Sequence, residues 1–508
     1  MSRLQRTLAM LRARLESRGL MIGEVHAIDE TADATSISAP ATHDSRSVAR
    51  GGIFVAIHGA VRDGREFAGE AIARGAVAVI ATREIQGSSV PQLLVSDARA
   101  ALAEAAAWWE GDPADGLITI GVTGTDGKTT TSTLLASALS GAGIPTGLVS
   151  TALRRVGGRQ TAPPAHQTTP EAPELQALLR AVAEAHDRAA VIEATSHGLA
   201  LDRVGAIPFA AGILTNLTSD HLDFHGSVEA YHAAKLRLVR AISSTSASRA
   251  AGLAPTMVLP IDCPAAEPFA ETAIAGGIRI ARFGVISDGS LLINGVPHRI
   301  ELAMPGRVNA LNAAAALTLI DAWNLPLPPA IAAVAAEFGP PGRAERIDEG
   351  QPFAVLVDFA HTGASMRGAM QIARELLTAG GRLLVVTGAA GERDPGRRTA
   401  IGAAVASADA VWIADEDPRF EDSNEIAAAI VAAIAAERAG PVRPTTRIEH
   451  DRRVAIGAAI GEARAGDVVL LAGKGHERTI ERRGADEPWD EAGVAREVLR
   501  SLGYPRDT

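Results

Sequence analysis

A glycine-rich loop between an apolar run and a helical segment constrains the fold of this chain most strongly. Residues 117–122 are apolar and predict a buried strand, and a helix is expected over residues 129–141. Between them, residues 121–130 are Gly-Val-Thr-Gly-Thr-Asp-Gly-Lys-Thr-Thr. Glycines there let backbone N–H groups approach phosphate oxygens, and the start of the helix adds a partial positive charge. The segment is one residue longer than GxxxxGK[ST] but keeps the glycines, lysine and hydroxyl in order.

We therefore predict that this loop binds the phosphates of a nucleotide. Lys128 is expected to bridge the terminal phosphates, and Thr129 to offer its hydroxyl to Mg²⁺. The alternative is a glycine-rich turn that only caps a helix, which the strand–loop–helix context disfavours. The predicted nucleotide-binding residues of the loop are Gly124, Thr125, Asp126, Gly127, Lys128, Thr129 and Thr130.

Two breaks divide the chain, whose 508 residues suggest about three domains. Residues 111–113 (Gly-Asp-Pro) and 339–342 (Gly-Pro-Pro-Gly) cannot continue a helix or a central strand. We predict α/β domains over residues 1–115, 116–340 and 341–508, because strand-like runs alternate with helical segments in each. The strands are expected at residues 52–57, 76–80, 117–122, 189–192, 211–214, 353–357, 382–387, 410–414 and 467–472, with helices at 1–20, 67–74 and 98–110.

Charge and composition exclude several classes of protein. The net charge of -10 argues against a nucleic-acid binder, because phosphate contacts need clustered Lys and Arg. Cys263 is the single cysteine, so neither an intrachain disulfide nor a Cys-based zinc site can form. No stretch reaches about 18 uncharged apolar residues, and the N-terminus lacks the apolar core of a signal peptide. We expect no membrane span and a cytoplasmic location.

Polar clusters follow two of the predicted strands. Glu193 comes directly after residues 189–192, and Asp220, His221, Asp223 and His225 follow residues 211–214. Because ligands bind at the carboxyl ends of strands in open α/β sheets, these side chains are expected near the phosphate loop. A carboxylate there suits Mg²⁺. The alternatives are an ordinary surface acid and a solvated polar loop.

The motifs together resemble those of the Mur ligases, and most closely the MurE type. The resemblance covers nearly the whole chain and implies an N-terminal UDP-sugar-binding α/β domain, a central P-loop ATPase-like parallel-sheet domain and a C-terminal Rossmann-like α/β domain. It rests on Gly-Thr-Asp-Gly-Lys-Thr-Thr (124–130), Glu-Ala-Thr-Ser-His (193–197), Thr-Asn-Leu-Thr-Ser-Asp-His-Leu-Asp-Phe-His-Gly (215–226), Tyr-His-Ala-Ala-Lys (231–235), Asp-Pro-Arg (417–419) and Gly-Lys-Gly-His-Glu (473–477).

The resemblance implies an ATP- and Mg²⁺-dependent ligase of peptidoglycan synthesis. Such enzymes phosphorylate the D-glutamate side-chain carboxylate of UDP-N-acetylmuramoyl-L-Ala-D-Glu and join the acyl phosphate to a diamino acid. Lys235 matches a lysine that is carbamylated by CO₂ in that family. The implied catalytic residues are Lys128, Glu193, His221 and Lys235, and the implied metal-positioning residues are Thr129, Glu193, His221 and Lys235.

Substrate contacts carry over residue by residue. Ser45 resembles a UDP-sugar contact, Asn309 an adenine-side contact and Arg343 a phosphate-side contact to ATP. Thr168, Thr169, Thr195 and Arg203 resemble residues that hold the dipeptide. The positions implied for the incoming amino acid are Arg393, Glu416, Asp417, Pro418, Arg419, Gly473 and Glu477.

The identity of that amino acid stays open at this point. Enzymes that add meso-diaminopimelate commonly carry Asp-Asn-Pro-Arg, whereas residues 416–419 are Glu-Asp-Pro-Arg. Arg419 and Arg393 suit the distal carboxylate of diaminopimelate, which lysine and ornithine lack. The charge of Asp417 opposes that carboxylate and favours an ammonium. Diaminopimelate is the favoured prediction, with L-lysine and L-ornithine as alternatives.

Two rival functions remain. One is another amide ligase of the Mur superfamily, such as folylpolyglutamate synthase, but those enzymes lack the front domain to which Asp44, Ser45 and Arg46 belong. The other is a non-catalytic ATP-binding homologue, against which Glu193, His221 and Lys235 argue. A monomer is expected.

Overall fold

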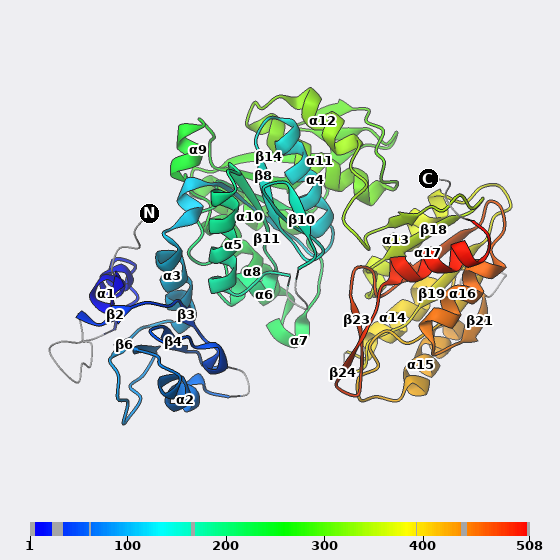
Figure 1. The fold of residues 1–508 in the computed structure, drawn as a ribbon. Coiled ribbons are helices and arrows are strands. Elements are labelled where there is room, and N and C mark those ends of the chain that lie inside the picture. The colour runs from blue at the N-terminus through cyan, green and yellow to red at the C-terminus, as the bar shows by residue number, and fades with distance from the viewer. Residues whose placement is uncertain are drawn as a thin grey trace.

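The computed structural model describes residues 6–22, 34–59, 62–163, 168–392, 394–437 and 444–504. Three separate sheets, each with its own helices, follow one another along the chain (Figure 1). Their strands lie within residues 41–94, 118–298 and 345–472. The predicted three-part α/β architecture is confirmed.

The N-terminal part is a four-stranded parallel sheet, in the order β3-β4-β5-β6, with three helices. Its alternating side chains bury Ile53, Val55 and Ile80 against α1 and α3. Arg180 of the central part donates to the carbonyl oxygen of Glu110 at 3.3 Å, which links the two parts. The elements are β1 (Arg6–Thr7), α1 (Leu8–Ser17), β2 (Ser36–Ile37), β3 (Ala41–Thr42), β4 (Ile53–Ala56), α2 (Ala68–Ala73), β5 (Ala78–Ala81), β6 (Gln92–Leu94) and α3 (Ala98–Glu110).

The central part holds a ten-stranded sheet in the order β10-β9-β8-β11-β7-β12-β13-β14-β15-β16. Its six inner strands are parallel, and antiparallel strands extend both edges. The strands are β7 (Ile118–Thr123), β8 (Thr146–Val149), β9 (Arg154–Val156), β10 (Arg159–Thr161), β11 (Ala189–Glu193), β12 (Ala211–Leu214), β13 (Thr256–Pro260), β14 (Arg279–Val285), β15 (Leu291–Ile293) and β16 (Val296–His298).

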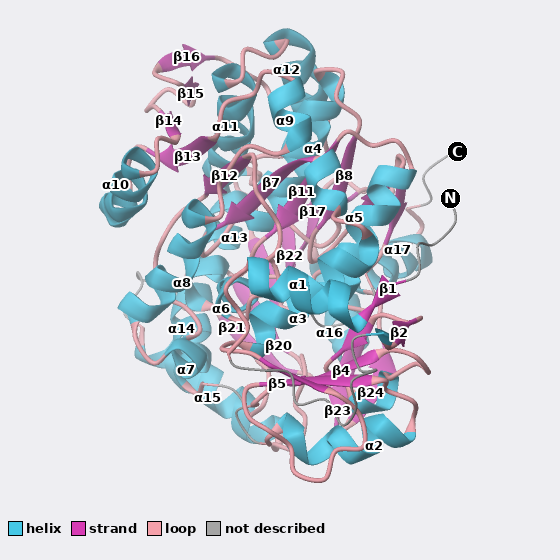
Figure 2. Ribbon diagram, turned by 90° about the vertical axis from the view of Figure 1, so that its left-hand side faces the viewer, coloured by secondary structure: helices cyan, strands magenta, loops and turns pink. Residues whose placement is uncertain are grey.

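Helices cover both faces of this sheet, and buried aliphatic clusters fill the space on either side. They are α4 (Lys128–Gly141), α5 (Ala172–Glu184), α6 (Ser196–Ala200), α7 (Leu222–His225), α8 (Val228–Arg240), α9 (Ser246–Ala250), α10 (Glu267–Ala275), α11 (Arg307–Ala322) and α12 (Leu327–Ala335). Figure 2 shows β8, β11 and β7 side by side in the central sheet. Because β7 lies between β11 and β12, the polar residues that follow these three strands meet at one sheet edge.

The C-terminal part is a six-stranded sheet in the order β17-β18-β22-β19-β20-β21, parallel except for β17. A hairpin of β23 and β24 leaves it beyond β22. The elements are β17 (Glu345–Ile347), β18 (Ala354–Asp358), α13 (Gly363–Glu375), β19 (Leu383–Thr387), α14 (Gly396–Val405), β20 (Ala410–Ile413), α15 (Ser423–Ala436), β21 (Thr445–Ile448), α16 (Arg452–Glu462), β22 (Val468–Ala472), β23 (Thr479–Arg482), β24 (Ala485–Pro488) and α17 (Glu491–Ser501).

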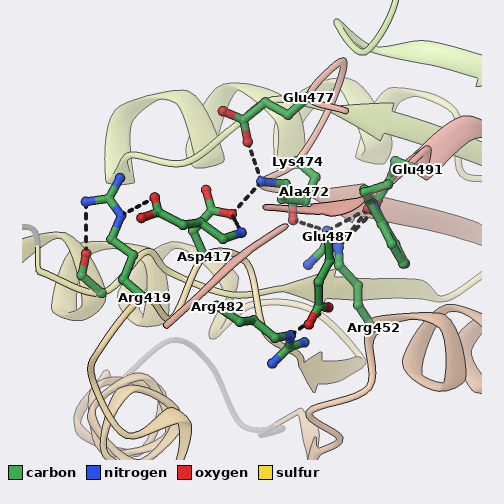
Figure 3. Close-up of polar contacts among 12 residues, drawn as sticks. Asp417, Arg419, Arg452, Ala472, Lys474, Glu477, Arg482, Glu487 and Glu491 are labelled. Atoms are coloured by element: carbon green, nitrogen blue, oxygen red, sulfur yellow. Dashed lines mark hydrogen bonds and ion pairs between the residues drawn. The ribbon is translucent and has the colours of Figure 1, made fainter. Parts of the chain in front are cut away.

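A fully buried ion pair joins α16, α17 and β22 in this part (Figure 3). Both side chains are 0% exposed, and an Arg452 nitrogen lies 2.6 Å from Glu491 Oε1. Arg452 also donates to the carbonyl oxygen of Ala472 at 2.8 Å, and Trp489 Nε1 donates to Glu491 at 2.7 Å. The end of β22, which carries Gly473, is thereby fixed to two helices.

We expect Glu491→Gln to lower the free energy of unfolding by about 3 to 5 kcal/mol, because it leaves the guanidinium of Arg452 buried without a counter-charge. Urea unfolding followed by tryptophan fluorescence measures this. Glu497→Gln is the matched control, because Glu497 pairs with Arg453 at the surface. The double change Arg452→Met/Glu491→Leu should recover most of the loss. Equal stability of Glu491→Gln and Glu497→Gln would contradict this account.

None of the helices in the described ranges has the length and apolar character that crossing a lipid bilayer demands.

Candidate active site

The loop between β7 and α4 has the backbone shape that the glycines of the sequence predicted. Gly124 and Gly127 have positive φ values of 144° and 80°. A side chain at either glycine would collide, since an added Cβ would lie 1.9 Å from Thr215 Oγ1 at Gly124 and 2.3 Å from Asn312 Oδ1 at Gly127. Only glycine therefore fits both positions, which lets Thr215 and Asn312 pack directly against the loop backbone.

Neighbouring segments hold this loop in place. Asn216, after β12, accepts from the backbone N–H of Asp126 at 2.9 Å and donates to its carbonyl oxygen at 3.1 Å. The hydroxyl of Thr125 accepts from the backbone N–H of Thr218 and from the Tyr231 hydroxyl, both at 3.0 Å. Lys128 Nζ donates back to the carbonyl oxygen of Thr125 at 2.6 Å, so its ammonium lies over the loop.

Glu193, at the end of β11, lies beside the first turn of α4. Its side chain is buried, with 1% exposed, and both carboxylate oxygens lie 3.1 Å from the Thr129 hydroxyl. The backbone N–H and hydroxyl of Thr151, after β8, donate to Glu193 Oε2 at 2.9 Å. The predicted proximity of Thr129 and Glu193 is thus present in the structure. Thr151 was missed by the sequence analysis, although it also follows a strand of the same sheet.

Lys235, on α8, points at the phosphate loop from within the protein. It is 1% exposed, and its Nζ donates to the carbonyl oxygen of Gly124 at 2.6 Å. The Nζ also lies 4.5 Å from the centre of the Tyr231 ring. Burial, together with the charge of Lys128, lowers the pKa of Lys235 well below its ordinary value. A lowered pKa favours the neutral form of the amine, which is the form that reacts as a nucleophile.

His221 begins α7 with a left-handed φ of 52°. Its Nε2 lies 3.4 Å from Asp220 Oδ2, and its ring packs edge-on against that of His197 at 4.6 Å. Burial lowers the pKa of His221, an effect that the Asp220 carboxylate opposes. Asp220 also lies 3.6 Å from Arg397 of α14, so this contact links the central and C-terminal parts.

The residues around the loop suit Mg²⁺ rather than a metal enclosed by protein. Among the described residues, no group of three or more His, Cys, Asp and Glu side chains gathers to form a metal cage. Mg²⁺ uses one or two protein oxygens together with phosphate oxygens and water. The adjacent Thr129 hydroxyl and Glu193 carboxylate supply such oxygens. The imidazole of His221 is a weaker donor to so hard a cation, which favours a positioning role for it.

The four residues predicted to hold a dipeptide lie together near the end of β11. Thr195 caps α6, and its backbone N–H donates to the Thr169 hydroxyl at 3.1 Å. Thr169 is 0% exposed, so its side chain positions the others instead of facing the solvent. Arg203 donates to the carbonyl oxygen of Thr169 at 3.0 Å and pairs with Glu171 at 2.6 Å. Its Nε is buried and has no hydrogen-bond partner among the described residues.

Three predicted contacts lie away from this cluster. Asn309, on α11, is buried and donates to the carbonyl oxygen of Pro305 at 2.7 Å. Arg343 stacks on the Phe359 ring at 4.6 Å, and its buried Nε has no partner among the described residues. Ser45 lies in the N-terminal part, where its hydroxyl donates to Glu70 at 2.8 Å. Asn312, for which no binding role was predicted, contacts the loop more directly than Asn309, because it lies against Gly127.

The segment 416–419 follows β20 and forms a charged array with the end of β22 (Figure 3). Lys474, 1% exposed, lies 2.9 Å from Asp417 and 2.6 Å from Glu477. The Asp417 charge therefore has a buried counter-charge, which weakens the argument that it repels a substrate carboxylate. Burial raises the pKa of Glu416 to about 7. An added Cβ at Gly473, whose φ is 116°, would lie 2.7 Å from Glu416 Oε2, so the two strand ends are in close contact.

One cleft of about 920 Å³ lies between the central and C-terminal parts. Arg397, Arg367 and His361 also face it from the C-terminal side. Lys128, Glu193 and Lys235 are not among its lining residues. Arg393 lies outside the described residues. The predicted site residues that line the cleft are Thr125, Asp126, Thr168, Thr195, Arg203, His221, Glu416, Asp417, Arg419 and Glu477.

Three family models match the chain. One described as "Mur ligase family, catalytic domain" matches residues 41–109, the "Mur ligase middle domain" matches residues 122–320, and the "Mur ligase, glutamate ligase domain" matches residues 342–475.

Individual relatives match along nearly their full length. The chain is 40% identical to a "UDP-N-acetylmuramyl-tripeptide synthetase" of Roseiflexus, over 91% of this chain and 94% of that protein. It is 35% identical to a "UDP-N-acetylmuramoyl-L-alanyl-D-glutamate--2,6-diaminopimelate ligase" of Streptomyces coelicolor, over 94% of each. A solved structure with the latter name is 26% identical, with a TM-score of 0.64, and covers 98% of this chain and 99% of its own.

Proposed function

Because the chain belongs to the Mur ligase family, we propose that it adds a diamino acid to UDP-N-acetylmuramoyl-L-Ala-D-Glu. Members of this family are ATP-dependent ligases that form amide bonds, and this chain is one of them. The observation that carries the proposal is the cleft that joins Thr125 and His221 of the central part to Arg419 and Glu477 of the C-terminal part. The nucleotide, the substrate carboxylate and the amine can meet there.

The proposed reaction has two steps. An oxygen of the D-glutamate side chain attacks the γ-phosphorus of ATP, ADP leaves, and an acyl phosphate forms. The amine then attacks the acyl carbon, the C–O bond to phosphate breaks, and the ammonium proton is released with phosphate. Phosphorylation is needed because a free carboxylate would have to expel oxide.

The chain's own residues bind and orient the reacting groups. The uncapped N-terminus of α4, which follows Gly127, offers backbone N–H groups to the phosphates, and Lys128 offsets the charge that moves to the leaving oxygen. Arg203, with its unpartnered Nε, is the candidate for a dipeptide carboxylate. Bound Mg²⁺, held in part by Thr129 and Glu193, would neutralise phosphate charge during the transfer.

Carbamylation of Lys235 is part of the proposal. A neutral lysine amine adds to CO₂ and loses a proton, which converts a cation into a carboxylate. The lowered pKa of Lys235 and its burial next to the charge of Lys128 support this, because Lys128 would stabilise the new anion. The product would supply, besides Thr129 and Glu193, a further oxygen ligand for a metal near the phosphate loop.

We further propose meso-diaminopimelate as the incoming amino acid, with L-lysine and L-ornithine as the alternatives. Several relatives at 35–37% identity are named diaminopimelate ligases. Arg419 lines the cleft and can meet a distal carboxylate. The requirement for ATP supports a cytoplasmic location, and the monomer remains a prediction.

Phosphate release with each diamino acid tests the proposed function. Release should require ATP, the UDP-dipeptide and the amino acid together, and diaminopimelate should give the largest kcat/KM. Phosphate release that is indifferent to the amine would instead support a non-catalytic or regulatory homologue.

For Arg419→Ala we expect about a tenfold higher KM for diaminopimelate, because a charge-assisted contact to its distal carboxylate is lost. The KM for ATP should stay unchanged. Arg453→Ala, which removes an exposed arginine of the same domain, is the control. Steady-state kinetics in both substrates measures the effect, and an unaltered KM for diaminopimelate would exclude Arg419 from its binding.

A further inference from the structure

Glu481, which no sequence motif singled out, makes two separate contacts with the segment 416–419. Its carboxylate accepts from Arg419 Nε at 3.0 Å, and its backbone N–H donates to Asp417 Oδ1 at 2.8 Å. It belongs to β23, which begins two residues beyond Glu477 and is paired with β24. The hairpin thus places the Glu481 carboxylate beside Arg419, although the two residues are 62 positions apart in the sequence.

Backbone contacts fix Arg419 against the same hairpin. Its N–H donates to the carbonyl oxygen of Glu481 at 3.1 Å, and its own carbonyl oxygen accepts from Arg483 at 2.8 Å. Arg419 holds a left-handed φ of 54°, a conformation that a non-glycine residue adopts only when its surroundings impose it. The backbone of Arg419 is therefore held in one conformation, and its guanidinium lies next to the Glu481 carboxylate.

The charges around this wall do not cancel. Lys474 is buried between Asp417 and Glu477, so one ammonium serves two carboxylates (Figure 3). Arg419, 18% exposed, is matched by Glu481, which is 36% exposed. Within this array of described side chains, three carboxylates (Asp417, Glu477 and Glu481) therefore face two cations. The positive charge of Arg419 is not available in full to a substrate while Glu481 holds it.

We propose that Glu481 is a specificity-determining residue that competes with the distal carboxylate of the incoming amino acid for Arg419. This inference rests on the proposed function. It makes the pocket less selective for a carboxylate-bearing amino acid than Arg419 alone would make it, because that carboxylate must displace Glu481. An amino acid that ends in an ammonium alone meets the excess negative charge without displacing anything.

The test compares Glu481→Gln with the parent chain in the phosphate-release assay, using the UDP-dipeptide with meso-diaminopimelate or L-lysine. The ratio of kcat/KM for diaminopimelate over lysine should rise about fivefold, as for loss of one ion pair at a partly exposed site. Glu487→Gln is the matched control, because it removes a carboxylate from the same hairpin that pairs with Arg482 and not with Arg419. In an Arg419→Ala background, Glu481→Gln should leave the ratio unchanged.

An active parent chain with an unchanged or lower ratio in Glu481→Gln would overturn the inference alone. A lower ratio would mean that Glu481 serves only to hold Arg419 in place. Glu481→Ala checks that the remaining amide is not masking an effect. A parent chain with no amine-dependent phosphate release would contradict the proposed function, and the inference with it.

Discussion

Lys235→Ala is expected to lower kcat by about a thousandfold, because it removes the side chain that would carry the carbamate next to the phosphate loop. Small carboxylates such as acetate or formate should restore part of the activity, since they can occupy the space of the lost carbamate. The amine is buried at 1% exposure and directed at Gly124, so a free acid reaches the same place only in the truncated variant. The rescue is measured as the rate of phosphate release with and without the added carboxylate. Weak ligands require a concentration on the order of 100 mM.

Two further variants separate the carbamate from other roles of Lys235. Lys235→Arg keeps a positive charge but cannot be carbamylated, so it should be as inactive as Lys235→Ala. Arg240→Ala, an exposed change on the same helix, should retain full activity and controls for disturbance of α8. High activity in Lys235→Arg would show that a cation, and not a carbamate, is needed.

Glu193→Gln is expected to lower kcat/KM by about a hundredfold or more and to raise the Mg²⁺ concentration needed for half-maximal activity. The amide can still accept hydrogen bonds from Thr129 and Thr151, so the geometry should survive while the negative charge is lost. A Mg²⁺ titration of the phosphate-release rate measures both effects.

The control for this variant is a buried carboxylate of the same domain. Asp187 is 8% exposed and accepts from the backbone N–H of Gly157 at 2.8 Å, away from the loop. Asp187→Asn should therefore leave the Mg²⁺ dependence unchanged. If Glu193→Gln behaved like Asp187→Asn, Glu193 would have no part in holding the metal.

Local signals in the sequence predicted much of the fold. The helix over residues 98–110 and the strand over 211–214 have the predicted bounds. The helix expected from residue 129 begins at Lys128, because Gly127 caps it in a left-handed conformation. The amphipathic N-terminal segment gives a helix only over Leu8–Ser17, which starts where Thr7 accepts from Met10, and residues 1–5 lie outside the described ranges. The capping residues, and not the spacing of apolar residues, determine where such helices begin and end.

The parts of the site that depend on distant pairings were not predictable in the same way. Strand order brought Thr129 and Glu193 together, since polar residues after parallel strands share an edge. Lys474, which follows β22, and Glu481, in the β23–β24 hairpin, contact segment 416–419 across 57 to 64 residues, and no local signal in the sequence indicates these pairings. For this reason, the prediction that Asp417 repels a substrate carboxylate did not take the neighbouring ammonium of Lys474 into account.

The most direct test of the account is the stoichiometry of phosphate release against tripeptide formation in one reaction mixture. With ATP, Mg²⁺, UDP-N-acetylmuramoyl-L-Ala-D-Glu and meso-diaminopimelate present, one phosphate should appear for each UDP-tripeptide formed, and omission of any one substrate should stop both. Phosphate release that continues at the full rate without the amino acid, with no tripeptide in the products, would contradict the proposed amide-forming function.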